Sequence, residues 1–232
     1  MGIDYTKRPA AGGGAPSAGG GAVDLGKVTL TKSAPSVSLT KRGAAGGELR
    51  VNLNWNARPA AATGGGFLKR MAAAAQGGID LDLGCLYEFT DGSKGVVQAL
   101  GNAFASRNAS GPPIITLDGD DRSGTNSGGE NLRIDLSRIA EIRRVLVFAF
   151  IYQGVPNWAA ADGVVTMHPA GGAPIEVRLD ESDPRAPMCA IALLTNSGSD
   201  LTVNREVRYV HGGQDLLDRE YGWGMEWGRG RK

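Results

Sequence analysis

Carboxylate side chains crowd into one short stretch of the chain, residues 118–136, which reads DGDDRSGTNSGGENLRIDL. The stretch holds five acidic residues and four glycines and then runs into an alternating apolar segment. Carboxylates this close together repel one another unless a cation lies among them. The glycines permit positive φ angles, so peptide carbonyls can also turn inward beside the carboxylates. The oxygen-bearing side chains before the apolar segment include Asp118, Asp120, Asp121, Ser123, Thr125, Asn126 and Glu130.

A second acidic pair lies upstream, in the segment IDLDLGCLYEF at residues 79–89. Asp80 and Asp82 are two residues apart in an alternating pattern, so a strand here projects both carboxylates from one face. The apolar residues Ile79, Leu81 and Leu83 then occupy the other face. Two anions on one sheet face destabilise it unless they are solvated or paired.

Oxygen ligands without histidine or cysteine suit a hard divalent cation, and Ca²⁺ accepts an irregular shell of about 6–8 oxygens. The loop does not follow the EF-hand pattern, because Arg122 stands fifth from Asp118 and Gly129 stands twelfth. A calcium site would therefore combine the loop with another element, and the Asp80/Asp82 face is the candidate. Two alternatives stay open at this point. One is a solvated turn neutralised by Arg122, and the other is a glycosidase with paired carboxylates.

Composition narrows the function classes. The formal net charge is +1 over 232 residues, which argues against a whole-surface nucleic-acid binder. Aromatic residues make up 6% of the chain, few for a sugar-binding cleft. The 2 cysteines, Cys85 and Cys189, lie in apolar contexts and are expected to be buried thiols. No zinc-ligand spacing, secretory signal or spanning apolar run is found, so we expect a cytoplasmic protein.

The hydrophobic pattern predicts an all-β fold, a β-sandwich of two antiparallel sheets with one or two short helices. Residues 1–22 are expected to be a flexible Gly/Ala/Pro-rich leader, and residues 23–232 one domain with an insertion at 60–78 that holds a short helix at 67–75. Residues 212–223 predict a helix or turn, and the tail around Trp223 and Trp227 predicts a last strand packed on the core. Strands are predicted at 28–32, 36–41, 48–55, 79–89, 132–136, 144–152, 163–168, 174–179, 188–196 and 201–210.

Several of these segments together resemble the TerD-like tellurium-resistance family of bacterial stress-response proteins. The matching segments are VTLTKSAPSVSLTKRG, IDLDLGCLYEF, GDDRSGTNSGGENLRIDL and RVLVFAFIY. The resemblance implies a β-sandwich that binds calcium and has no established catalytic activity. It also implies a role in resistance to tellurite, phage and other stresses, with protein partners near the inner membrane. The charge balance implies no specific nucleic acid as a partner.

The family's ligand positions fall on Asp80 and Asp82, on the loop motif Gly119–Gly124, and on Glu130. We therefore expect Asp80, Asp82, Asp120, Asp121, Gly124 and Glu130 to bind Ca²⁺, with Asp118, Ser123 and Asn126 as additional candidate ligands. The acidic pair that the family carries before the glutamate is Gly128-Gly129 here. Fewer carboxylates weaken calcium binding. The alternative function is thus a scaffolding module whose metal site has decayed.

Overall fold

The structure is a computed structural model that describes residues 26–44, 46–55, 80–118, 128–153, 158–179, 183, 185–198 and 200–228. The expected leader at 1–22 and the expected insertion at 60–78, with its helix at 67–75, lie outside these residues.

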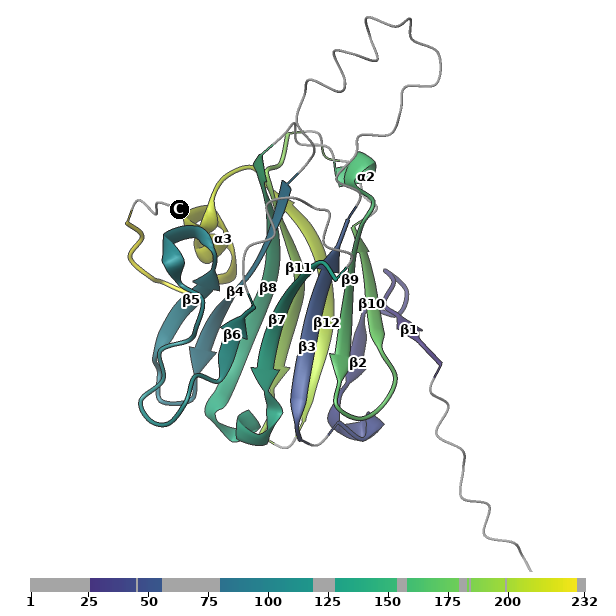
Figure 1. Cartoon of the computed structure of the whole chain (residues 1–232), viewed down its shortest axis with the longest axis vertical. Coiled ribbons are helices and arrows are strands. Elements are labelled where there is room, and N and C mark those ends of the chain that lie inside the picture. Colours follow the sequence, from purple (N-terminus) through teal and green to yellow (C-terminus); the bar gives the residue numbers. More distant parts are fainter. Residues whose placement is uncertain are drawn as a thin grey trace, which may run out of the picture.

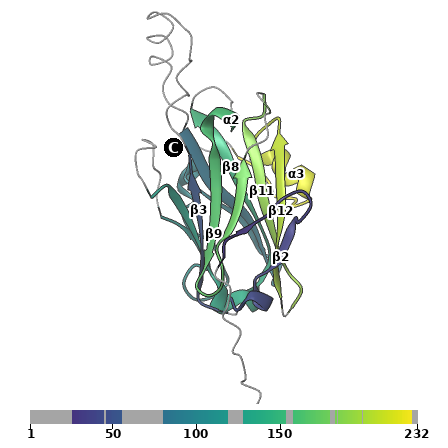
Figure 2. The same cartoon turned by 90° about the vertical axis from the view of Figure 1, so that its right-hand side faces the viewer.

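The described strands form two six-stranded sheets that face each other as two layers (Figures 1 and 2). The first sheet has the order β1 (Val28–Thr29), β10 (Ile175–Leu179), β9 (Gly163–Pro169), β3 (Glu48–Asn54), β7 (Glu130–Asp135), β6 (Ile115–Leu117). The second has the order β2 (Ser36–Ser38), β12 (Leu201–Val210), β11 (Met188–Asn196), β8 (Ile142–Gln153), β4 (Asp80–Phe89), β5 (Lys94–Gln98). Neighbouring strands are antiparallel except β1 and β10. The predicted all-β sandwich is confirmed.

Short helical elements join or cover the strands. They are η1 (Thr40–Arg42), η2 (Leu100–Asn102), η3 (Leu136–Glu141), α2 (Trp158–Ala161) and α3 (Gln214–Tyr221). Among the described helices, none is long and apolar enough to cross a membrane.

Alternating side chains build the core between the two sheets. In β3, Leu49, Val51 and Leu53 point into the sandwich and are fully buried, while the residues between them are partly exposed. The central strand β8 is covered on both faces, as its nearly continuous apolar sequence predicts. Its residues Val145, Val147 and Ala149 join the main core, whereas Leu146, Phe148 and Phe150 join a second cluster.

The second cluster lies under α3, which packs on the outer face of the second sheet (Figure 2). Leu217 of α3 and Trp223 just after it are fully buried there. The helix ends where Gly222 takes a left-handed conformation, with φ of 61°. The helix predicted near residue 214 is confirmed, and so is the packing of Trp223. The predicted last strand is wrong, because residues 223–228 form no strand.

Both cysteines are buried in the main core and neither forms a disulfide, as predicted. Burial raises the pKa of the Cys85 thiol far above its ordinary value. The thiolate is therefore scarce at neutral pH, and Cys85 acts as a small apolar side chain.

Candidate metal site

Asp80 and Asp82 begin β4, and the alternation of this strand is as predicted. Leu81 and Leu83 enter the core between the sheets, while Asp82 lies on the outer face opposite Phe150 of β8. Asp80 is 6% exposed and Asp82 is 0% exposed. Water therefore does not solvate this pair of carboxylates, and burial makes a charge costly unless it is paired or bound to a metal.

Glu130 reaches this region from the opposite sheet. It is the first residue of β7, whose inward positions are Glu130, Leu132 and Ile134, and it is 2% exposed. Its Oε2 accepts a hydrogen bond of 2.6 Å from the backbone N–H of Leu83. Strand β5 pairs with β4 only from Gly84 onward, so Leu83 lies where that edge of β4 is not covered by β5. The glutamate thus binds the backbone of β4 directly after Asp82.

The described residues that flank the acidic loop are anchored beside β3 and β7. The N–H of Asp118 donates to the carbonyl of Asn131 at 3.0 Å, and Asn52 Nδ2 donates to the carbonyl of Gly128 at 2.5 Å. The loop therefore leaves and rejoins the sandwich next to Glu130. Sequence reasoning did not identify Asn52 as an anchor, and its outward position in β3 was the available signal.

The middle of the loop, residues 119–127, lies outside the described residues. This part holds Asp120, Asp121, Ser123, Gly124 and Asn126, so their role as ligands stays a prediction. Within the described residues alone, no three His, Cys, Asp or Glu side chains gather as a metal-binding group would require. An ion site here would therefore need further ligands, for which the loop side chains are the predicted source.

Asp118 binds an arginine on the outer face of the first sheet. Its two carboxylate oxygens accept hydrogen bonds from Arg133 at 2.7 and 2.9 Å, and Arg133 also binds Glu48 at 2.6 Å. The hydrogen bonds to Asp118, and to a smaller extent that to Glu48, raise the pKa of the Arg133 guanidinium above its ordinary value. The carboxylate of Asp118 is thus already neutralised by a cation of this chain.

Gly129 explains one departure from the family pattern. Its φ is +61°, and a Cβ added there would lie 2.1 Å from the carbonyl oxygen of Leu53. Any side chain would therefore collide with β3 where β7 begins. The acidic residue that the family pattern has in this region does not fit at Gly129 with β7 placed as it is.

The fold and the site define a class of protein, a two-sheet β-sandwich with buried carboxylates where an acidic loop enters and leaves. The chain is 48% identical over 210 residues to the tellurium resistance protein TerA of Alcaligenes sp.. The aligned region covers 90% of this chain and 60% of that relative, so the chain spans less than two thirds of the relative's length. No family model matches the chain.

A solved structure of a homologue of the telluride resistance protein TerD from Streptomyces coelicolor is similar in fold. It has a TM-score of 0.50 at 20% identity, over 76% of this chain and 98% of that chain. The predicted resemblance to tellurium-resistance proteins is confirmed by the sequence match with TerA.

Proposed function

We propose that the chain is a non-enzymatic, calcium-binding stress-response protein of the TerD type, active in the cytoplasm of a bacterium. The observation that supports this best is the burial of Asp80 and Asp82 at the start of β4, together with the buried Glu130, which binds the β4 backbone at Leu83 and lies beside the two ends of the acidic loop. Buried carboxylates are retained where a cation or several hydrogen bonds stabilise the charge.

The donor set fits calcium better than softer metals, because every candidate side chain offers oxygen. Asp80, Asp82 and Glu130 would hold the ion from the sandwich. Asp120, Asp121 and a carbonyl at Gly124 would hold it from the loop. A bound ion supplies positive charge, and its binding orders the 118–130 loop because the carboxylates otherwise repel. The ordered loop then presents a surface to a protein partner of the stress response, such as a family member or a membrane-associated complex.

Two substitutions test the proposed ligands. Asp82→Ala and Asp120→Ala should each remove most of the calcium-dependent rise in melting temperature of the chelator-treated protein. The matched control is Asp91→Ala, which deletes a carboxylate from the exposed β4–β5 turn, where Asp91 binds only Ser93 among the described hydrogen bonds. If both site variants respond to calcium as the wild type does, the ion is not bound where we propose.

A scaffolding module without a metal is the second candidate, and the geometry at Gly129 favours it. That position has no room for an acidic side chain. The assembly of a chain that starts at Val23 separates the two candidates. Loss of self-association or partner binding with intact folding would support scaffolding by the leader, whereas unchanged assembly would count against it.

A further inference from the structure

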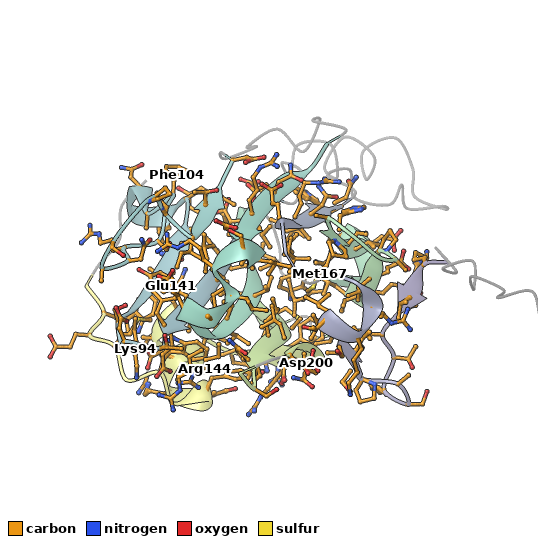
Figure 3. All side chains as sticks on the ribbon, turned by 90° about the horizontal axis from the view of Figure 1, so that it is seen from below. Lys94, Phe104, Glu141, Arg144, Met167 and Asp200 are labelled. Atoms are coloured by element: carbon orange, nitrogen blue, oxygen red, sulfur yellow. The ribbon has the colours of Figure 1, made fainter. Side chains whose placement is uncertain are left out.

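A cleft of about 920 Å³ opens along the free edge of β5. Strand β5 is the last strand of the second sheet, and β6 is the last strand of the first sheet on the same side of the molecule (Figure 1). Lys94 and Phe104, which line the cleft, lie on that side in the view from below (Figure 3). A pocket of this size falls in the range of ligand-binding clefts, about 300–1,000 Å³.

The cleft forms where the chain leaves one sheet and joins the other. After β5 the chain turns back at η2, and Gln98 N–H donates to the carbonyl of Ala103 at 2.9 Å. The following residues turn away from β5 and pair with β6. The N–H of Ser106 donates to the carbonyl of Ile115, and the N–H of Leu117 donates to the carbonyl of Phe104, both at 2.8 Å. The gap between β5 and residues 103–107 therefore widens from Ala103 onward. Its far end is closed by Tyr87, whose hydroxyl accepts the N–H of Arg107 at 2.9 Å.

Both walls of the gap present main-chain groups. In an antiparallel strand, successive residues direct their N–H and C=O groups to opposite sides. Because Gln98 N–H points away from β4, those of Val96 and Lys94 point away from β4 as well. Because Phe104 and Ser106 pair with β6, the N–H and C=O of Ala105 point away from β6. Val96 and Ala105 both line the cleft. The cleft thus has the hydrogen-bonding edges of a strand position that no described segment fills.

The third wall is the C-terminal segment, and it is held in place by a buried carboxylate. Asp218 is 3% exposed and accepts hydrogen bonds from Gly224 N–H at 2.8 Å, Met225 N–H at 3.0 Å and Trp227 Nε1 at 3.1 Å. Lys94 Nζ donates to the carbonyl of Trp223 at 2.7 Å. The side chains of Met225 and Trp227 therefore stand at fixed places along the cleft, where they offer apolar and aromatic contact.

The charge in the cleft favours an acidic ligand. Its charged lining residues are Lys94, Arg107 and Glu226. Lys94 is engaged by Trp223 and Glu88. In the part of the chain that the structure describes, the Arg107 guanidinium makes no hydrogen bond or ion pair, so it is available to a carboxylate.

We propose that this cleft binds an extended peptide segment of a protein partner, which adds to β5 as a further strand. Main-chain hydrogen bonds to Lys94, Val96 and Ala105 hold the peptide, its apolar side chains contact Met225 and Trp227, and an acidic side chain binds Arg107. The inference goes beyond the proposed function and does not depend on calcium.

The test uses the full chain and a fluorescein-labelled probe peptide of sequence Gly-Val-Thr-Val-Glu-Val-Thr-Gly, followed by fluorescence anisotropy. The probe should bind saturably below about 1 mM, an affinity stronger than about −4 kcal/mol. Val96→Pro should weaken binding at least about tenfold, because proline removes the donor that faces the peptide and is tolerated on an edge strand. A probe methylated on alternate backbone nitrogens should weaken binding to the wild type similarly.

A charge exchange tests the arginine. The variant Arg107→Glu should no longer bind the acidic probe and should instead bind a probe with lysine in place of glutamate. The control is Lys41→Glu, which makes the same charge change on an exposed residue outside the cleft and should bind both probes as the wild type does. No binding up to about 1 mM would overturn the proposal, as would equal binding of the methylated probe. If Val96→Pro does not fold, the methylated probe and the charge exchange decide on folded protein.

Discussion

At the scale of single residues, Gly129 fixes how the acidic loop rejoins the sandwich. Its left-handed backbone and the 2.1 Å between an added Cβ and the Leu53 oxygen mean that no other residue fits without moving β7 or β3. The same backbone segment places Glu130, the next residue, against Leu83. A change at Gly129 should therefore affect both stability and the candidate site.

We expect Gly129→Ala to lower the free energy of unfolding by about 2 kcal/mol or more, since it adds a collision to an unfavourable φ. Gly92→Ala is the matched control, because Gly92 has a φ of +86° but nothing within 4 Å of an added Cβ. Its cost should be about 1 kcal/mol, from φ alone. Urea unfolding measures the free energy of unfolding of both variants. Equal losses in the two variants would show that the added Cβ at position 129 does not collide with Leu53.

His168 should make stability depend on pH. It lies in β9 opposite Arg50 of β3. Two causes lower the pKa of His168 below its ordinary value of 6.5. The larger is burial of the imidazole, and the smaller is the positive charge of Arg50. When pH falls through 6.5, the unfolded chain gains a proton that the folded chain does not, so the folded state loses stability until its own lower pKa is reached.

Between about pH 7.5 and pH 5.5, the free energy of unfolding should fall less in His168→Gln than in the wild type. Urea unfolding at both pH values measures this difference. Arg50→Gln should reduce the fall by a smaller amount, because burial is the larger cause. A variant with the same pH dependence as the wild type would assign the effect to other groups.

The candidate site could be predicted from the sequence only in part. The inward positions of Leu81 and Leu83, with Asp82 on the other face, follow from the two-residue period of a strand, which is a local rule. The bond from Glu130 to Leu83 joins two sheets across 47 positions of the chain, and no local pattern specifies such a contact. The pairing of Asp118 with Arg133 likewise depends on how the loop meets β7.

At the scale of elements, long alternating or apolar runs were predicted closely, whereas the short edge strands β1 and β2 were predicted too long and other short elements were missed. Strands β3, β4, β8 and β12 match their predicted segments closely. Strand β6 has three residues and β5 carries no clear alternation, so both were missed, as was the four-residue helix α2. These elements are set by their neighbours in the sheets and not by their own sequence.

The C-terminal segment shows why the predicted last strand failed. Gly222 and Gly224 have φ angles of 61° and 73°, which end α3 and prevent an extended strand. The segment is held instead by Asp218 and by Arg144, whose guanidinium lies 3.8 Å from the centre of the Trp223 ring. Three hydrogen bonds to one buried carboxylate are a contact that the spacing of tryptophans does not reveal.

Asp218→Ala should therefore lower the free energy of unfolding by about 2–3 kcal/mol, because two backbone N–H groups and an indole N–H lose a charged acceptor. The tryptophan fluorescence should shift to the red as Trp227 becomes more exposed. The variant Asp218→Asn keeps an oxygen acceptor, so its free energy of unfolding should fall less than that of Asp218→Ala. Loss of stability without a fluorescence shift would mean that Asp218 supports α3 but not the tail.

At the scale of the whole molecule, the sandwich carries a candidate ion site and a candidate peptide cleft. The acidic loop starts and ends beside Glu130, and the cleft lies along the edge of β5 and is walled by the C-terminal segment. A calcium-dependent loop and a peptide cleft would let one protein combine an ion signal with partner binding.

Calcium should stabilise the whole fold, because an ion that binds only the folded state adds RT ln(1 + [L]/Kd). This amounts to about 2.7 kcal/mol at a free calcium concentration of about 100 times Kd. The melting temperature of chelator-treated protein should rise with added calcium, and magnesium at the same concentration should have much less effect. Equal shifts with both ions would indicate screening of surface charge instead of a specific site.

Calorimetric titration of chelator-treated protein with calcium, and separately with magnesium, tests the central claim most directly. We predict saturable calcium binding with a Kd of about one micromolar or tighter, and much weaker magnesium binding, because the irregular oxygen shell suits the larger ion. No heat from calcium, together with a melting temperature that calcium does not move, would contradict the claim.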